Sequence, residues 1–183
     1  KLTYTVTTVD DIARDAGISR TTFYRHFDSK WAAAQALFFE VGAPVRLLHE
    51  QMAALVNPTD AQIRQWLGRV IDVLDANRIL VQAMREADAI EPKSDPVVTA
   101  THDEMIRLFA MHLPAFRAAS SRAPSNVAAR TRAHILLLQF DQFWYAVFGR
   151  KSIDRVSFSR GMSLQFRRCI EGTARRKARA GAL

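Results

Sequence analysis

The sequence has little cysteine and no long apolar run. Its single cysteine, Cys169, excludes an internal disulfide and is compatible with a reducing compartment, so we expect a cytoplasmic protein. No uninterrupted apolar stretch is long enough to cross a bilayer, and no apolar signal region follows the first residues. We therefore expect no membrane partner.

The usual motifs of catalysis and metal binding are also missing. The five histidines are scattered without the spacing of metal ligands, and there is no glycine-rich phosphate loop, nucleophile elbow or cysteine pair. His102, Asp103 and Glu104 are consecutive, so a helix would direct them to different faces. These absences predict no catalytic residues, no metal and no cofactor, and they leave an all-helical enzyme only as an alternative.

What the sequence does contain is a compact motif in residues 8–30, TVDDIARDAGISRTTFYRHFDSK. Thr8 can cap a short helix, with Asp11 completing a capping box, and Gly17 can adopt the left-handed conformation of the turn that follows. Ser19 can cap the next helix. This order of signals is typical of a helix-turn-helix that reads DNA.

The second helix of the motif, over residues 20–26, has one apolar and one polar face. Phe23 and Phe27 are four residues apart and face inward, so the side chains between them present donors outward on a helix that fits a major groove. Residues 1–56 carry six basic and six acidic side chains, although the whole chain has a formal charge of +8. Attraction to DNA must therefore come from where the donors lie, or from the missing N-terminal part.

The motif resembles the DNA-binding segment of the tetracycline-repressor (TetR) family of bacterial transcription regulators. The resemblance covers about a seventh of the chain and is carried by Ile12-Ala13, Ala16 to Ser19, Thr22 to Tyr24, and Lys30. It implies phosphate contacts by Thr8, Tyr24 and Lys30. It implies contacts to base edges by Arg20, Thr21, Thr22, Arg25 and His26. The alternative is that the two arginines are ordinary surface charges and that His26 only packs.

In that family another helix precedes the motif, whereas only seven residues precede Thr8 here. We expect that the first helix is missing or truncated, and that Val9, Ile12, Phe23 and Phe27 are only partly covered. A protein-interaction or orphan regulator without specific DNA binding, using this apolar patch for a partner, is the second alternative.

The rest of the chain reads as all-α. We expect a DNA-binding domain over residues 1–43, an effector-binding and dimerisation domain over residues 44–173, and a basic tail over residues 174–183. A connecting helix should begin near Ser29 and break at Gly42 and Pro44, which makes a candidate hinge. Further helices are expected over residues 59–74, 78–89, 94–113, 126–148 and 154–172, with a mobile loop over residues 118–125.

The segment from residue 135 to 148 is apolar nearly all round, so its helix needs partners on both sides. A second copy of the chain could cover one side, as in the resembled family, and place two reader helices about 34 to 36 Å apart on a palindromic site. The alternative is that both sides are monomer core. The predicted dimer interface comprises Leu136, Phe143, Trp144, Val147, Phe158, Met162, Phe166 and Ile170.

An apolar effector cavity is predicted in the larger domain, with a few polar anchors. Asp141 needs a partner amid apolar neighbours, which Tyr145, His134, a second protomer or a cationic ligand could supply. Closed core is the alternative for the aromatic and methionine side chains. The predicted ligand-binding residues are Trp66, Met84, His102, Met105, Phe109, Phe140, Asp141 and Tyr145, with Phe116 and Gln139 as further candidates.

Together these features predict a ligand-responsive transcriptional regulator. We expect a repressor that binds double-stranded DNA with a palindromic operator as a homodimer and is released by a small apolar or aromatic effector.

Overall fold

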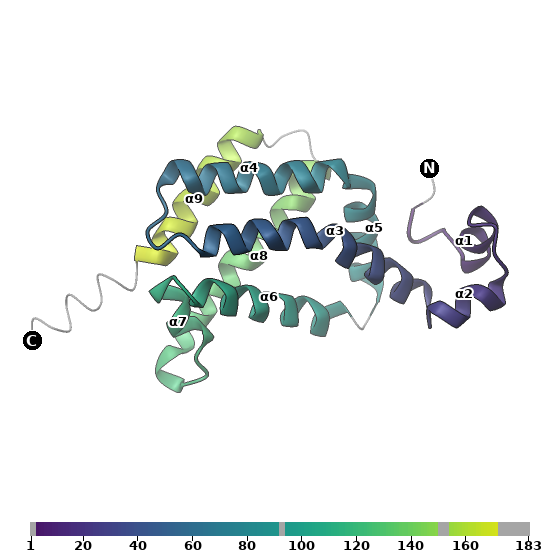
Figure 1. The fold of residues 1–183 in the computed structure, drawn as a ribbon, viewed down its shortest axis with the longest axis horizontal. Coiled ribbons are helices and arrows are strands. Elements are labelled where there is room, and N and C mark those ends of the chain that lie inside the picture. Colours follow the sequence, from purple (N-terminus) through teal and green to yellow (C-terminus); the bar gives the residue numbers. More distant parts are fainter. Residues whose placement is uncertain (1–2, 92–93, 150–153, 172–183) are drawn as a thin grey trace, which may run out of the picture.

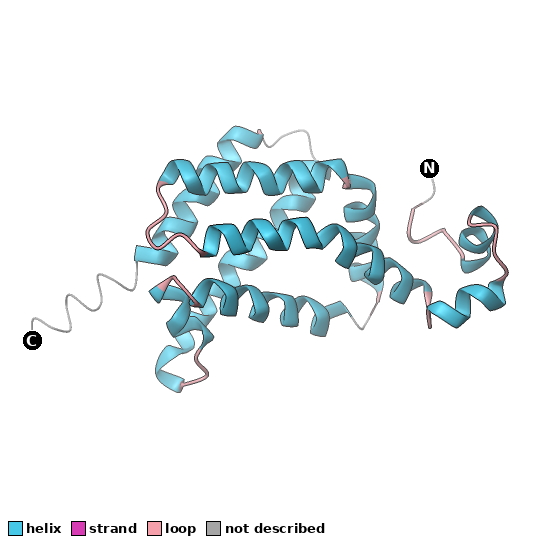
Figure 2. Ribbon diagram, in the orientation of Figure 1, coloured by secondary structure: helices cyan, strands magenta, loops and turns pink. Residues whose placement is uncertain are grey.

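The computed structural model describes residues 3–91, 94–149 and 154–171, and the regular structure in these ranges is entirely helical (Figure 2). The all-α prediction is confirmed. Within the same ranges, no helix has the length and apolar character needed to span a membrane. The helices are α1 (Val9–Asp15), α2 (Arg20–His26), α3 (Lys30–Ala53), α4 (Asp60–Ala76), α5 (Arg78–Ile90), α6 (Ser94–Ala110), α7 (Pro114–Ser120), the 3-10 helix η1 (Pro124–Asn126), α8 (Val127–Gly149) and α9 (Arg155–Glu171).

The helices form a small unit and a large unit joined by α3. Figure 1 shows α1 and α2 at one end of the molecule, and α3 running from α2 into the larger group of helices, where it lies between α4 and α6. Helix α3 also packs against α5, while α8 packs against α7 and α9. The predicted basic tail lies outside the described residues.

The predicted break at Gly42 and Pro44 is wrong, because α3 is continuous from Lys30 to Ala53. Pro44 cannot donate to the preceding turn, but packing against α4, α5 and α6 holds the rest of the helix together. In Figure 1 the part of α3 nearer α2 runs at an angle to the remainder, so the helix bends without ending. The predicted domain boundary between residues 43 and 44 therefore falls inside a helix.

Pro114 starts a helix that the sequence did not reveal. We expected it to end the preceding helix, which already stops at Ala110, and Pro114 is instead the first residue of α7. Proline suits this position because its missing N–H would have no partner inside the helix there. The predicted loop over residues 118–125 is correspondingly wrong, since it contains the end of α7 and the start of η1.

The core of the large unit is built around the indole of Trp66. Its ring centroid lies 5.2 Å from that of Phe166, 5.5 Å from that of Phe140 and 5.9 Å from that of Phe109. Phe116 packs on Phe109 and Phe166 in the same cluster. Trp66, Phe109 and Phe116 are buried in this core, and they are not among the residues that line the cavity of this unit.

Candidate DNA-binding surface and ligand cavity

The caps predicted for α1 and α2 are present and set the geometry of the motif. Thr8 Oγ1 accepts a bond of 3.1 Å from the Asp11 N–H, while the Thr8 N–H donates to Asp11 Oδ2 at 3.0 Å. The bonds from Thr8, together with Arg14, lower the pKa of Asp11 to about 2. Gly17 has φ 66°, and the Ser19 hydroxyl accepts from the N–H of Thr22. The turn between the helices is thus fixed locally.

The outward face of α2 is laid out as expected. Arg20, Thr21, Tyr24, Arg25 and His26 are exposed and available to a ligand. Phe23 is buried beneath them, and its ring packs on that of Phe27 at 5.5 Å. Thr22 is only half-exposed, and its hydroxyl lies 2.9 Å from that of Ser19.

Arg20 is already paired within the motif. Its Nη1 lies 3.2 Å from both carboxylate oxygens of Asp10, and its guanidinium carbon lies 5.5 Å from the ring centroid of Tyr24. Both charged side chains are mostly exposed, so this ion pair contributes little stability. Arg20 can therefore leave Asp10 for another anion.

Lys30 is bonded inside the chain, although we expected it to contact phosphate. Its Nζ donates to the backbone carbonyls of Tyr4 at 2.7 Å and Thr7 at 2.9 Å, and it lies 4.1 Å from the Tyr4 ring centroid. The ammonium group therefore ties the segment before α1 to the start of α3. This role depends on contacts 23 and 26 residues apart in sequence.

A second, smaller core supports that segment. Tyr4, Trp31, Met84 and Ala87 pack together, and Tyr4 Oη donates to Glu91 Oε1 at 2.8 Å. Burial and this bond raise the pKa of Tyr4, so the phenol stays protonated as a donor. Val9, Ile12 and Phe27 are partly covered as expected, whereas Phe23 is fully buried, contrary to expectation.

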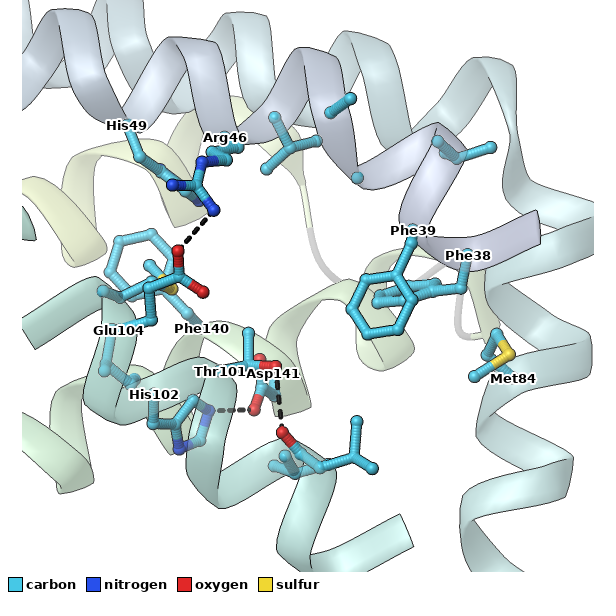
Figure 3. Close-up of a pocket in the computed structure, with 18 of the residues that line it drawn as sticks. Phe38, Phe39, Arg46, His49, Met84, Thr101, His102, Glu104, Phe140 and Asp141 are labelled. Carbon is cyan, nitrogen blue, oxygen red and sulfur yellow. Dashed lines mark hydrogen bonds and ion pairs between the residues drawn. The ribbon is translucent and has the colours of Figure 1, made fainter. Parts of the chain in front are cut away.

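A cavity of about 690 Å³ opens inside the large unit, lined by residues of α3 to α6 and α8 (Figure 3). Five predicted ligand-binding residues line it, namely Met84, His102, Met105, Phe140 and Asp141. The side chain of Tyr145 lies outside the described residues, and Gln139 is exposed away from the lining.

Helix α3 contributes cavity residues that the sequence did not lead us to expect. Trp31, Phe38, Phe39 and His49 all line the cavity, and Figure 3 shows the Phe38 and Phe39 rings extending from α3 toward its centre. A signal was present, because adjacent phenylalanines on a helix cannot both pack against the same neighbouring helix.

The cavity contains a buried imidazole paired with a carboxylate. His102 Nε2 and Asp141 Oδ2 are 2.6 Å apart, so Asp141 has a partner that we had not named beside Tyr145, His134, a second protomer and a cationic ligand. His134 instead faces Asp103, at 3.5 Å. Thus the two His–Asp pairs lie on the same two helices, but only the first lines the cavity.

Two more titratable groups on α3 line the cavity. Arg46 pairs with Glu104 across the cavity and with Glu50 on its own helix. His49 is buried, which lowers its pKa to about 4, so its imidazole is neutral at pH 7. Among the described residues, no group of three histidine, cysteine or acidic side chains is placed to hold a metal ion.

The residues predicted for a dimer interface mostly face inward. Leu136, Met162 and Phe166 belong to the large unit's own core, and Phe158 and Ile170 are half-buried against it. Phe143, Trp144 and Val147 have side chains outside the described set. Among the described side chains of α8 and α9, the large apolar ones that are exposed are different residues, namely Val127, Ile135, Leu138, Val156 and Leu164.

Comparisons with known proteins agree with this geometry. Residues 4–41 match the family model of bacterial regulatory proteins of the tetR family. No curated protein matches the chain. Eleven chains of solved structures match, among them the TetR family transcriptional regulator PfmR from Thermus thermophilus, with a TM-score of 0.59, 15% identity, and coverage of 92% of this chain and 90% of that one. At this identity the structural match shows a common fold.

Proposed function

We propose that the chain is a DNA-binding regulator of transcription of the tetR family, and that it is a ligand-responsive repressor that binds a palindromic operator as a homodimer. A small, largely apolar effector would occupy the cavity and release the DNA. The protein would act in the cytoplasm, and we assign the cavity a binding role and no catalytic one.

The observation that carries this proposal is the course of α3. Its first residue, Lys30, holds the segment before α1, and residues further along the same helix, Phe38 and His49 among them, line the cavity. A ligand that alters the position of α3 would therefore also move α1 and α2, which form the helix-turn-helix. The ligand must bind one arrangement more tightly than the other for this coupling to occur.

The small core provides a second route between the two sites. Trp31 and Met84 line the cavity and also belong to the small core that contains Tyr4. Displacement of either side chain by an effector would disturb Tyr4, whose carbonyl accepts from Lys30. The start of α1 would lose its support as a result.

Arg25 and Arg20 are the side chains that we propose for reading base edges, with Thr21 and His26 beside them and Tyr24 on phosphate. All five are exposed on one short helix, as a reader helix requires. The polar groups of Thr8, Thr22 and Lys30 already form hydrogen bonds within the chain. A contact of these residues with DNA would use the donors and lone pairs that these bonds leave free.

The homodimer is proposed to form through the solvent faces of α8 and α9. Ile135 and Leu138 are three residues apart on α8 and about half exposed, as is Leu164 on α9, which packs against α8. Large apolar side chains on two packed helices are the surface that a second copy would cover.

The test is a DNA-binding titration with the full-length protein. Duplexes selected from a randomised pool would be compared with scrambled duplexes at several salt concentrations. We expect tight, salt-sensitive and selective binding of two protomers to a short palindrome. Arg25→Ala should cost about 1 to 3 kcal/mol and relax the preference at one base position. Equal, weak binding to both duplexes would exclude the repressor and favour a partner-binding protein.

The dimer is tested separately by sedimentation. Leu138→Glu and Leu164→Glu should produce monomers, whereas Ile79→Glu, an equally drastic change at an exposed position of α5, should not. An unchanged dimer in the first two variants would move the interface away from this face.

A further inference from the structure

Among the described residues, the Asp141 carboxylate has one partner. Its Oδ2 lies 2.6 Å from His102 Nε2, and no other described residue bonds or pairs with it. Its side chain is 36% exposed, and the surface on which it lies is the cavity wall. One oxygen of a charged group therefore faces a mostly apolar space.

The other charged groups around the cavity differ from Asp141. The Glu104 carboxylate is paired with Arg46, whose guanidinium is shared with Glu50. Arg107 also lines the cavity but is exposed. Asp88 has interactions of its own. Among the described residues that line the cavity, Asp141 is a carboxylate paired with a histidine, and it lies next to Phe140 in the lining.

Those rings complete a site for a positive charge with an apolar body. Phe38 and Phe39 extend from α3 into the same space that Asp141 faces from α8, and Phe140 lines the wall beside it (Figure 3). Aromatic faces attract cations within about 6 Å of the ring centroid. A partly desolvated carboxylate gains more from an opposite charge than an exposed one, because less water screens the pair.

We propose that the cavity binds a lipophilic cation, an amine or quaternary ammonium carried on an aromatic or alkyl body, with Asp141 as its counter-charge. The proposal rests on the assignment of the cavity as the effector site. His102 orients the carboxylate by donating from Nε2, which leaves the second oxygen for the ligand. Met84 and Met105 supply a deformable apolar wall for the body of the ligand.

The experiment uses three probes that differ only in the head group: 4-phenylbutylamine, 4-phenylbutanol and 4-phenylbutyrate. Calorimetric titration of the full-length protein should show the amine binding about tenfold more tightly than the alcohol, which corresponds to about 1.4 kcal/mol. The carboxylate should bind most weakly, because it would meet Asp141 with a like charge.

Asp141→Asn removes the charge and keeps the shape. We expect the affinity for the amine to fall about tenfold, to that of the alcohol, while the affinity for the alcohol stays the same. Asp103→Asn is the matched control, since Asp103 also faces a histidine and is equally exposed but does not line the cavity. It should leave all three affinities unchanged.

The outcomes separate two failures. If the alcohol binds and the amine binds no better, the cavity is an effector site of another class and the lipophilic-cation proposal is overturned. If the carboxylate binds best, a positively charged side chain of the cavity wall is the recognising group, and the proposal is equally overturned. If no probe binds, the assignment of the cavity as an effector site fails too. The preference of the wild-type protein for the amine decides the matter even if Asp141→Asn does not fold.

Discussion

Tyr4 donates a hydrogen bond to Glu91 across 87 residues of sequence, and this contact joins the segment before the reader to the end of α5. The phenol is buried and Glu91 is half-buried, so the bond is partly shielded from water. Tyr4→Phe keeps the ring and removes the donor. We expect it to lower the free energy of unfolding by about 1 kcal/mol in urea denaturation. Tyr24→Phe, at an exposed ring, should leave it unchanged.

A related prediction concerns Asp10, which competes with DNA for Arg20. Asp10→Asn removes the ion pair and one negative charge beside the reader. We expect affinity for DNA to rise about threefold at low salt, and the gain to disappear at high salt, because both effects are screened. Asp15→Asn, the loss of an equal charge at the far end of α1, should raise affinity less. Equal gains would show that only net charge matters.

The neutral state of His49 predicts that acid destabilises the fold. The pKa of His49 is about 4 in the folded chain, below its ordinary value, so between about pH 6.5 and 4 the unfolded chain binds a proton that the folded chain does not. The free energy of unfolding should therefore fall by about 2 kcal/mol from pH 7 to pH 5 on account of this group.

His49→Phe should remove that component of the pH dependence. Phenylalanine preserves the ring packing on Trp66 and Phe109 and does not titrate. The control is His112→Phe, because His112 is exposed. Chemical denaturation at a series of pH values measures the difference, and parallel curves for His49→Phe and the wild type would contradict the prediction.

Two alanine substitutions distinguish a core position of α9 from a surface position. Phe166 is 1% exposed and packs on Trp66, so Phe166→Ala should cost about 3 to 5 kcal/mol. Leu164 is 50% exposed, and Leu164→Ala should change the stability of the monomer by less than about 0.5 kcal/mol. Thermal unfolding at several protein concentrations measures both effects. If the loss of stability caused by Leu164→Ala depends on protein concentration, Leu164 contributes to the dimer interface.

Pro44 provides a test of the bend in α3. Pro44→Ala restores an N–H to a helix that is otherwise continuous, which favours a straighter course. We expect the response to effector to change more than the affinity for DNA in the absence of effector. DNA titrations with and without 4-phenylbutylamine compare the two, and equal changes would count against a hinge.

The local parts of this fold could be predicted because their causes are local. Thr8, Gly17 and Ser19 act on residues within one turn of themselves, so the two short helices and the turn between them follow from the residue types. The same holds for the capping box of Thr59 and Gln62 that starts α4. Pro44 and Pro114 were misjudged because the signal of a proline depends on what packs around it.

The sequence by itself determined the helical class, the reader motif and the outward face of α2, because caps, turns and helical period operate over a few residues. Only the tertiary structure decided that Trp66 is core while Met84 lines a cavity, that Lys30 is held by Tyr4 and Thr7, and that His102 pairs with Asp141. Helical spacing shows that a side chain is buried, but it does not show which side chains it packs against, because the hydrophobic effect is non-directional. Partners distant in the sequence are chosen when the helices pack.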